Sequence, residues 1–333
     1  MHATSPFIDT VAVEAWDAWF RWREPGRLRD ISVEATWRRV ATSLANAEPV
    51  RLAGAHESEL MNALMSWRLL LDERVLATAG TGNANWPNND LAAVVNAAMF
   101  VRNPFSSRAS FDLAGFSATA ELAVAALDNA ASLGHGPSLH CHRFRIGVIG
   151  FADALELLEM PYGSAQACAK GGEIGRALAE GCFSGAVNSA KERGACNETS
   201  SAMLERAVER GMPKALLEQA RRHGLRHTQL TAIEAHPRLS LFANNVADAL
   251  DPLSGGETVH YVVTEEQTRS VRSSGYASNI RQTRPTIALA APRLEKTSSA
   301  LSAAARTAMH QALQPWIDEP IAQIPQATHA AEA

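Results

Sequence analysis

The densest group of metal-binding side chains in this chain comprises His135, His140, Cys141 and His142. Imidazole and thiolate groups suit zinc or iron. His140 and His142 are two residues apart, so both would lie on one side of an extended segment, with the remaining ligands supplied from elsewhere. The alternative is an exposed polar loop without a metal. His140 and His142 are therefore the candidate metal ligands.

A second group, Glu234-Ala-His-Pro-Arg-Leu-Ser240, contains residues that could hold an anion. His236 and Arg238 could bind a phosphate or carboxylate through charge-assisted hydrogen bonds. Pro237 removes an amide donor, and Glu234 adds a negative charge beside the pocket. Alternatively, Arg238 pairs with Glu234 and closes the pocket. The candidate phosphate-binding residues are Glu234, His236, Arg238 and Ser240.

The helices and strands that would position these groups are predicted from the spacing of hydrophobic residues and from the Gly and Pro residues that end such elements. Trp16, Trp19, Phe20 and Arg23 recur at helical spacing and share one face, and Ser32 is suited to cap the next helix. Such an aromatic face usually packs in a core or helix interface; a stacking platform for a ligand is the alternative. The pattern predicts a short buried strand at 145–151 and a strand at 227–233. It predicts helices over 57–79, 117–132, 152–160, 164–193 and 200–222, and either helix or strand over 91–101.

The composition is that of a globular protein, with 46% hydrophobic and 20% charged residues among 333. A net charge of −4 gives no basic footprint for nucleic acid, and no apolar run reaches membrane-spanning length. The N-terminus lacks the basic and apolar stretches of a secretory signal. The four cysteines are too few and too scattered for a disulfide framework, so a cytoplasmic location is expected.

One segment carries a family resemblance: Arg145-Ile-Gly-Val-Ile-Gly-Phe-Ala-Asp153, continuing to Gly163, resembles part of the ribonucleotide reductase large (catalytic) subunit. Its two glycines are too few for a dinucleotide fingerprint and instead favour close packing. Further blocks resemble the same family in the same order, and the early helices are closest to the adenosylcobalamin-dependent class. These blocks lie at 37–41, 69–81, 95–101, 127–129, 189–196, 228–240 and 250–253.

The resemblance implies a ten-stranded α/β barrel with a thiyl-radical cysteine on a finger loop and two further redox cysteines. This chain passes almost directly from Thr81 to Asn96, so the first half-barrel and finger loop are essentially missing. Asp90 stands where the second redox cysteine is expected. Cys196 and Glu198 have the family's Cys-x-Glu spacing, with Gly194 in place of asparagine, and are our candidate catalytic pair; a structural cysteine is the alternative.

We therefore expect a shortened, divergent α/β relative that is predominantly helical, with an incomplete or rebuilt barrel. The expected regions are an N-terminal helical region (1–50), a reductase-like domain (51–317) and a flexible tail (318–333). The expected function is binding of a nucleotide or other anion, with a regulatory or assembly role and without ordinary reductase activity. The alternatives are an enzyme with altered chemistry and an accessory chain of a larger reductase. The expected partners are a reductase subunit or a second copy, with no nucleic acid or membrane, and the resemblance leaves adenosylcobalamin or a metal as a cofactor.

Overall fold

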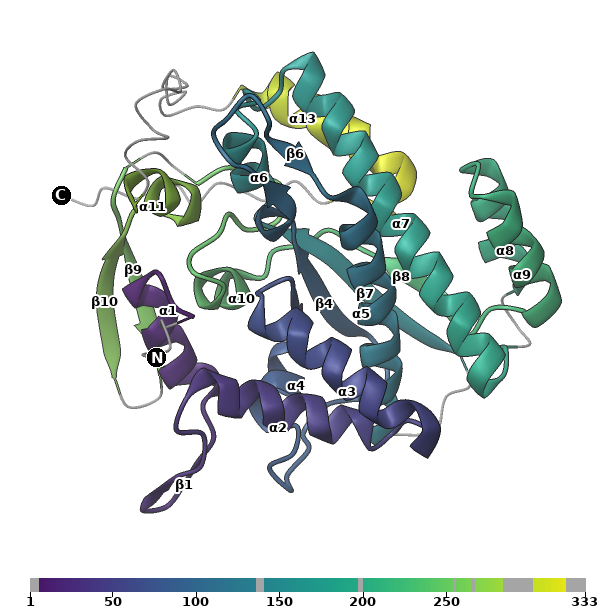
Figure 1. The fold of residues 1–333 in the computed structure, drawn as a ribbon, viewed down its shortest axis with the longest axis horizontal. Helices are drawn as coiled ribbons and strands as arrows, with labels where there is room; N and C mark the ends of the chain where they lie inside the picture. The colour runs from purple at the N-terminus through teal and green to yellow at the C-terminus, as the bar shows by residue number, and fades with distance from the viewer. Residues whose placement is uncertain are drawn as a thin grey trace.

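A four-stranded sheet forms the centre of the computed structural model, which describes residues 6–135, 141–196, 200–253, 256–264, 267–283 and 302–321 (Figure 1). The strand order is β3-β4-β7-β8, and the strands are β3 (Leu69–Leu71), β4 (Leu91–Asn96), β7 (His142–Ile149) and β8 (His227–Thr231). β4, β7 and β8 are parallel, and β3 pairs antiparallel with β4. Because these three strands are parallel, their carboxyl ends lie at the same end of the sheet.

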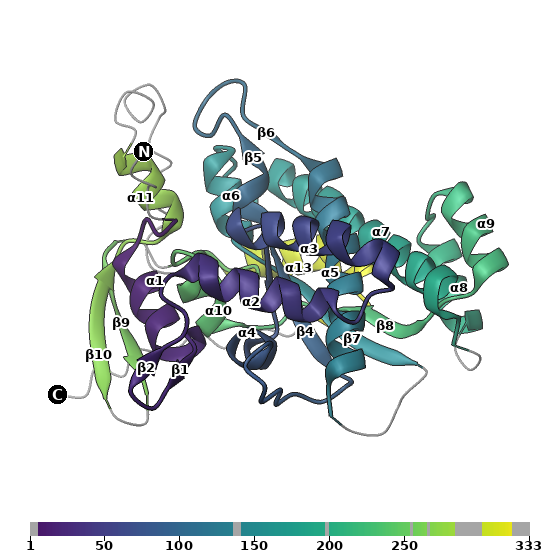
Figure 2. The same cartoon turned by 60° about the horizontal axis from the view of Figure 1, so that its bottom comes forward.

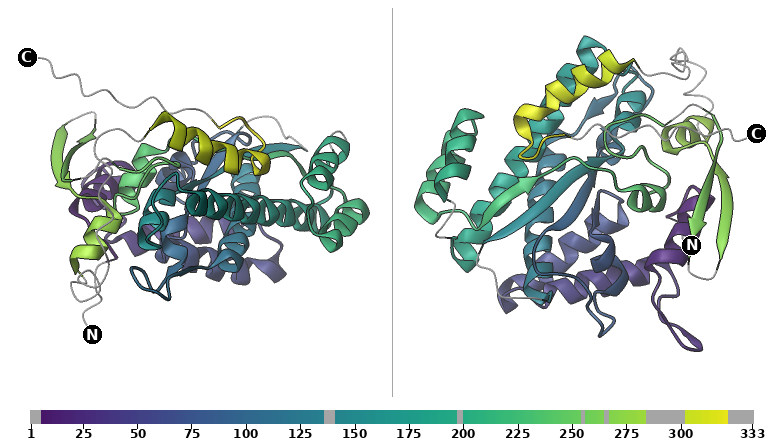
Figure 3. Two further views of the ribbon diagram at one scale, coloured as in Figure 1. Left: turned by 90° about the horizontal axis from the view of Figure 1, so that it is seen from above. Right: turned by 180° about the vertical axis from the view of Figure 1, so that it is seen from behind.

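Two long helices, α5 (Leu113–Leu133) and α7 (Ala165–Arg193), pack against each other and against the strands. α2 (Val33–Ala45) and α3 (Val50–Met65) lie over α5, while α13 (Ala303–Leu313) packs along α7. The view from behind in Figure 3 shows α13 and the chain that follows β8 on one side, with α2, α3 and α5 on the other side of the sheet. The sheet is therefore covered unequally on its two faces.

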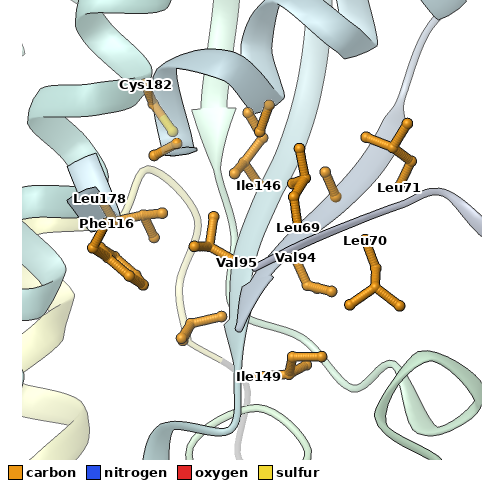
Figure 4. Close-up of a cluster of buried hydrophobic side chains, with 14 of the residues drawn as sticks. Leu69, Leu70, Leu71, Val94, Val95, Phe116, Ile146, Ile149, Leu178 and Cys182 are labelled. Carbon is orange, nitrogen blue, oxygen red and sulfur yellow. The ribbon is translucent and has the colours of Figure 1, made fainter. Parts of the chain in front are cut away.

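Runs of apolar residues make the central strands buried on both faces, as is usual for parallel strands. Every residue of β3 and β4 is buried. Figure 4 shows the strand side chains meeting those of α5 and α7. The labelled members of this core are Leu69, Leu70, Leu71, Val94, Val95, Phe116, Ile146, Ile149, Leu178 and Cys182.

A second layer is built from the N-terminal segment and α10 (Pro237–Phe242). α1 (Thr10–Ala15) packs on α10 and on the hairpin of β9 (Thr258–Val263) and β10 (Thr268–Ser273). η1 (Trp16–Phe20) continues α1 as a π-helix, and the ring of Phe20 stacks on that of Phe242 at 4.7 Å. The region 1–50 thus shares contacts with residues from the far end of the chain.

The remaining elements are peripheral. α8 and α9 project beyond the end of α7 (Figure 2). The bounds are β1 (Arg23–Glu24), β2 (Arg27–Leu28), α4 (Glu73–Thr78), η2 (Ala97–Phe100), β5 (Val101–Arg102), β6 (Ser110–Phe111), α6 (Phe151–Leu157), α8 (Ser200–Glu209), α9 (Lys214–His223), α11 (Tyr276–Thr283) and η3 (Gln314–Trp316). No helix in the described part of the chain is long and apolar enough to cross a membrane.

Several predicted elements are confirmed. β7 and α6 form the predicted strand and helix, joined at Gly150, whose φ of +64° suits glycine. α7 matches the predicted helix at 164–193, and α8 and α9 match the interrupted helix at 200–222. Ser32 caps α2 by accepting a hydrogen bond from the Ala35 amide. The ambiguous segment 91–101 is a strand only as far as Asn96.

The helix predicted over 57–79 is confirmed only in part, because 57–65 belong to α3 and 73–78 to α4, whereas 69–71 form strand β3. α3 ends after Met65, Trp67 adopts a φ of +58°, and β3 then pairs with β4. The leucines of β3 have high helix propensity, but their backbone groups are bonded to a strand more than twenty positions later. Tertiary pairing therefore overrides local preference in this segment.

The sheet does not close into a barrel within the described residues, which agrees with the predicted incomplete barrel. Its β8 edge is capped by Asp318, whose Oδ2 accepts hydrogen bonds from the Leu230 and Thr231 amides at 3.0 and 3.1 Å. Asp318 is the first residue of the predicted tail, and its main chain is also bonded to the Thr231 hydroxyl. Residues 322–333 lie outside the described residues.

Candidate functional site

The turn at 234–240, predicted as one anion site, sends its side chains in different directions. Glu234 and His236 lie together, with His236 Nε2 3.5 Å from Glu234 Oε1. Arg238 instead pairs with Glu73 at 3.4 Å, and Ser240 is buried on α10. The alternative pairing of Arg238 with Glu234 is therefore not the one observed.

Glu234 belongs to a charged cluster over the amino-terminal half of β7. Arg145 lies between two carboxylates, 3.2 Å from Glu234 and 3.5 Å from Asp90. Arg143 likewise contacts Asp90 at 3.3 Å and Glu319 at 2.9 Å. Burial raises the pKa of Glu234, against the opposing charge of Arg145. Because carboxylates outnumber arginines here, this cluster does not favour a further anion.

His236 is the N-cap residue of α10, and its backbone N–H donates to Asp248 Oδ1 at 2.8 Å. Burial lowers the pKa of the His236 imidazole, although the charge of Asp248 opposes that shift. Burial also raises the pKa of Asp248. The imidazole is therefore held toward its neutral form, which weakens it as an anion ligand.

Arg238 lies in a different place, at an open groove of about 890 Å³ between η1, α10 and the β9–β10 hairpin. Its guanidinium carbon lies 5.2 Å from the centre of the Trp19 ring, within cation–π range. Trp19 is fixed in turn by a 3.0 Å hydrogen bond from its indole N–H to the Val263 carbonyl. Figure 1 shows α10, α1 and the hairpin side by side.

Two further arginines, Arg23 and Arg269, line the groove, and Asp17 is the carboxylate among its lining residues. Arg269 is ion-paired with Glu14 and lies 3.6 Å from Asp17. Burial raises the pKa of Asp17, but hydrogen bonds and charge from arginines outweigh it and lower that pKa overall. The lining carries three arginines and one aspartate, and carboxylates just outside it, Glu73 and Glu14, pair with Arg238 and Arg269.

The predicted catalytic pair is only partly described. Cys196 forms a disulfide with Cys141, so its sulfur is not a free thiol in this structure. Glu198 lies outside the described residues. The free cysteines of the described residues, Cys168 and Cys182, both lie on α7, and burial raises the pKa of Cys182 well above its usual range. None of these four cysteines is among the residues lining the groove.

The predicted metal ligands are also only partly described, because His140 lies outside the described residues. His142 is buried at the start of β7, and its ring stacks on Phe144 with an interplanar angle of 5°. Burial lowers the pKa of His142. Within the part of the chain that the structure describes, no three His, Cys, Asp or Glu side chains are grouped to hold a metal ion.

Sequence reasoning found two parts of the groove and missed the rest. The aromatic stripe contained Trp19 and Arg23, although core packing was its favoured interpretation and a stacking platform the alternative, and the turn gave Arg238 as a candidate. Arg269 gave no signal, because it is one arginine on a strand far along the chain and reaches the groove only through the pairing of β9 with β10.

Comparison with known families gives one match. A family model described as the barrel domain of ribonucleotide reductase matches residues 89–323. No curated protein matches the chain. The matched range includes β4, β7, β8 and α10, and begins just before Asp90.

Proposed function

The chain belongs to the ribonucleotide reductase family through its barrel domain, and from that premise we propose that it binds a nucleotide or related phosphate-bearing anion without reducing it. The observation that carries this proposal is the groove formed by Trp19, Arg23, Arg238 and Arg269. Arginine forks suit phosphate oxygens, and an aromatic ring backed by a guanidinium suits a base.

The side chains of the groove are placed for such a ligand. The Arg238 side chain is 55% exposed and that of Arg269 is 39% exposed, so both can reorient toward phosphate. Each is held by a carboxylate, Glu73 or Glu14, that a phosphate would have to compete with. Binding should therefore weaken as salt rises, because the attraction is largely between exposed charges.

The positions of the cysteines support the proposal that the protein does not reduce the nucleotide it binds. Reduction in the family uses a thiyl radical and a dithiol, whereas Cys141, Cys196 and Cys168 are not among the groove residues and Cys182 is buried on α7. Asp90 stands at the start of β4, where the resemblance places a redox cysteine. We propose descent from the adenosylcobalamin-dependent class; the residues that line the groove include no cysteine and so do not supply the thiol that the family's radical chemistry uses.

We further propose that the open four-stranded sheet is the retained part of the family barrel and that the protein acts in the cytoplasm as a regulatory or assembly factor. The contacts of Asp318 support a chain that is stable without a second half-barrel, since Asp318 accepts hydrogen bonds from two backbone amides at the end of β8.

Isothermal titration with ATP, ADP and tripolyphosphate tests the proposal. Arg238→Gln should weaken ATP binding tenfold or more, since hydrogen bonds to charged groups contribute about 1.5–3 kcal/mol. Trp19→Leu should weaken ATP binding while leaving tripolyphosphate binding nearly unchanged, because only the nucleotide has a base to stack.

The matched control is Arg272→Gln. Arg272 also lies on β10 but is 73% exposed and pairs with Glu257 away from the groove. It should leave affinity within about twofold, a difference of about 0.4 kcal/mol. Absence of ATP binding at millimolar concentration, equal losses in the two arginine variants, or formation of deoxynucleotide by the purified protein would each refute the proposal.

A further inference from the structure

The disulfide between Cys141 and Cys196 joins two parts of the fold that are 55 residues apart in sequence. Cys141 immediately precedes β7 and is half-buried, whereas Cys196 follows the end of α7 and is 1% exposed. One sulfur can therefore be approached from solvent more readily than the other.

The segment that ends at Cys196 is also held by hydrogen bonds to the start of β8. The Cys196 amide donates to the Leu225 carbonyl at 2.8 Å. Arg226 donates to the carbonyl oxygens of Arg193 and Gly194 at 3.4 and 3.3 Å. The Arg226 contacts are long, so the covalent disulfide is a stronger restraint on this segment than they are.

The end of α7, just before this segment, forms one wall of a cavity of about 600 Å³ between α3, α5 and α7. Arg193, the last residue of α7, lines this cavity together with Glu48 and His56. Arg193 lies 3.0 Å from Glu48 and 2.9 Å from Asp128. A movement of the chain around Cys196 would therefore be transmitted to the cavity wall.

We propose that Cys141–Cys196 is a thiol–disulfide exchange site whose reductant is a dithiol and whose state sets the mobility of this wall. A thiolate of the dithiol attacks the Cys141 sulfur, and the Cys141–Cys196 bond breaks. Cys196 leaves as a thiolate and takes up a proton. The second thiol of the reductant then attacks the mixed disulfide and releases Cys141 as a thiol.

The overall change is a transfer of two electrons and two protons from the dithiol to the protein, and the dithiol becomes a disulfide. The location proposed above supports a reversible role, because disulfides in a reducing cytoplasm are usually transient and redox-sensing. Reduction should leave the fold intact, since the packing of α5 on α7 and the strand pairing do not involve the two sulfurs.

Hydrogen exchange measured by mass spectrometry tests this inference. The background variant is Cys168→Ser with Cys182→Ala, which leaves Cys141 and Cys196 as the cysteines of the chain. Adding dithiothreitol should raise amide exchange at least tenfold in 190–196 and 224–228, while exchange in β4 stays unchanged. Alkylation before and after reduction should count zero and then two free thiols.

The control adds Cys141→Ser and Cys196→Ala to that background. It should exchange as the reduced protein does and should not respond to dithiothreitol. The inference fails if both thiols alkylate before reduction, if exchange is the same in the two redox states, or if reduction raises exchange equally throughout the chain. The last result would identify a structural disulfide whose loss unfolds the protein.

Discussion

Replacing Asp128 by asparagine should cost this protein a large part of its stability. Asp128 lies on α5 with its side chain 1% exposed, and three cationic or titratable groups surround it. Arg226 Nε donates to both of its oxygens at 3.0 and 3.1 Å, Arg193 donates at 2.9 Å, and His227 Nε2 lies 3.4 Å away. Asparagine keeps the shape but removes the charge that compensates these groups.

The size of the loss follows from which charges remain unpaired. Arg193 keeps a second carboxylate, Glu48, at 3.0 Å, whereas Arg226 keeps neutral acceptors among the described residues: the asparagine oxygen and the carbonyl oxygens of Arg193 and Gly194. Breaking a buried pair by removing one partner costs about 3–5 kcal/mol. Because Arg193 is still paired, we expect about 3 kcal/mol, against a typical total of about 5–15 kcal/mol.

Acid should remove the same contribution in the wild-type protein. Burial raises the pKa of Asp128, but the hydrogen bond and charge of His227 and the charges of Arg226 and Arg193 outweigh it, so the pKa lies far below its usual range. A carboxylate with a depressed folded pKa stabilises the protein fully above its unfolded pKa. That stability is lost as the pH falls from about 4 toward the folded pKa.

Urea unfolding followed by circular dichroism at pH 7 measures the effect, and repeating it down to pH 3 tests the acid dependence. Glu257→Gln is the control, because it removes the exposed pair with Arg272 and should cost less than about 1 kcal/mol. A loss below about 1 kcal/mol for Asp128→Asn, or an unchanged acid dependence, would refute the reasoning.

Two further predictions concern the sheet and its surroundings. Gly147→Ala should destabilise the protein by about 1–3 kcal/mol in urea unfolding, because the new Cβ would lie 2.5 Å from the Ala232 carbonyl oxygen across the β7–β8 pair. Gly172→Ala on α7 should be neutral or stabilising by up to about 1 kcal/mol, since the new Cβ would lie 3.5 Å from its nearest neighbour, the Ala312 carbonyl oxygen. A larger loss of stability at Gly172 than at Gly147 would contradict the argument from steric contact. Burial raises the pKa of Asp153 to about 6, against hydrogen bonds from the Ala247 and Ala277 amides. A raised carboxyl pKa favours the folded state below the unfolded pKa near 4, so stability should fall from pH 4 to pH 7 relative to Asp153→Asn, and parallel pH profiles would disprove this.

The central strand and helix units were predictable because their signals are local. Glycine and proline mark the ends of β7 and α7, and apolar spacing fills the segments between them. β3 was not predictable, because its three leucines become a strand only by pairing with β4. Residue type cannot encode a partner that is brought near by the rest of the fold.

The candidate site was likewise predictable only in part. The sequence offered Arg238 as a candidate anion ligand from its charge and its place in a turn, with an ion pair to Glu234 as the alternative, and it could not specify the direction of the side chain. Arg238 is separated from its partner Glu73 by 165 positions, and Arg269 is separated from Glu14 by 255. Such contacts depend on how η1, α10 and the hairpin pack, and no local pattern records that packing.

The sequence by itself determined the family, the order of the main strands and helices, and the absence of a cysteine at position 90. Only the tertiary structure decided that Arg238 lies beside Trp19, that Asp318 caps the open edge of the sheet and that Cys141 meets Cys196. The physical reason is the distance in sequence over which each kind of interaction acts. Backbone propensity and apolar periodicity act over a few residues, whereas ion pairs, edge capping and disulfides join groups that are distant in sequence and close only after the core has packed.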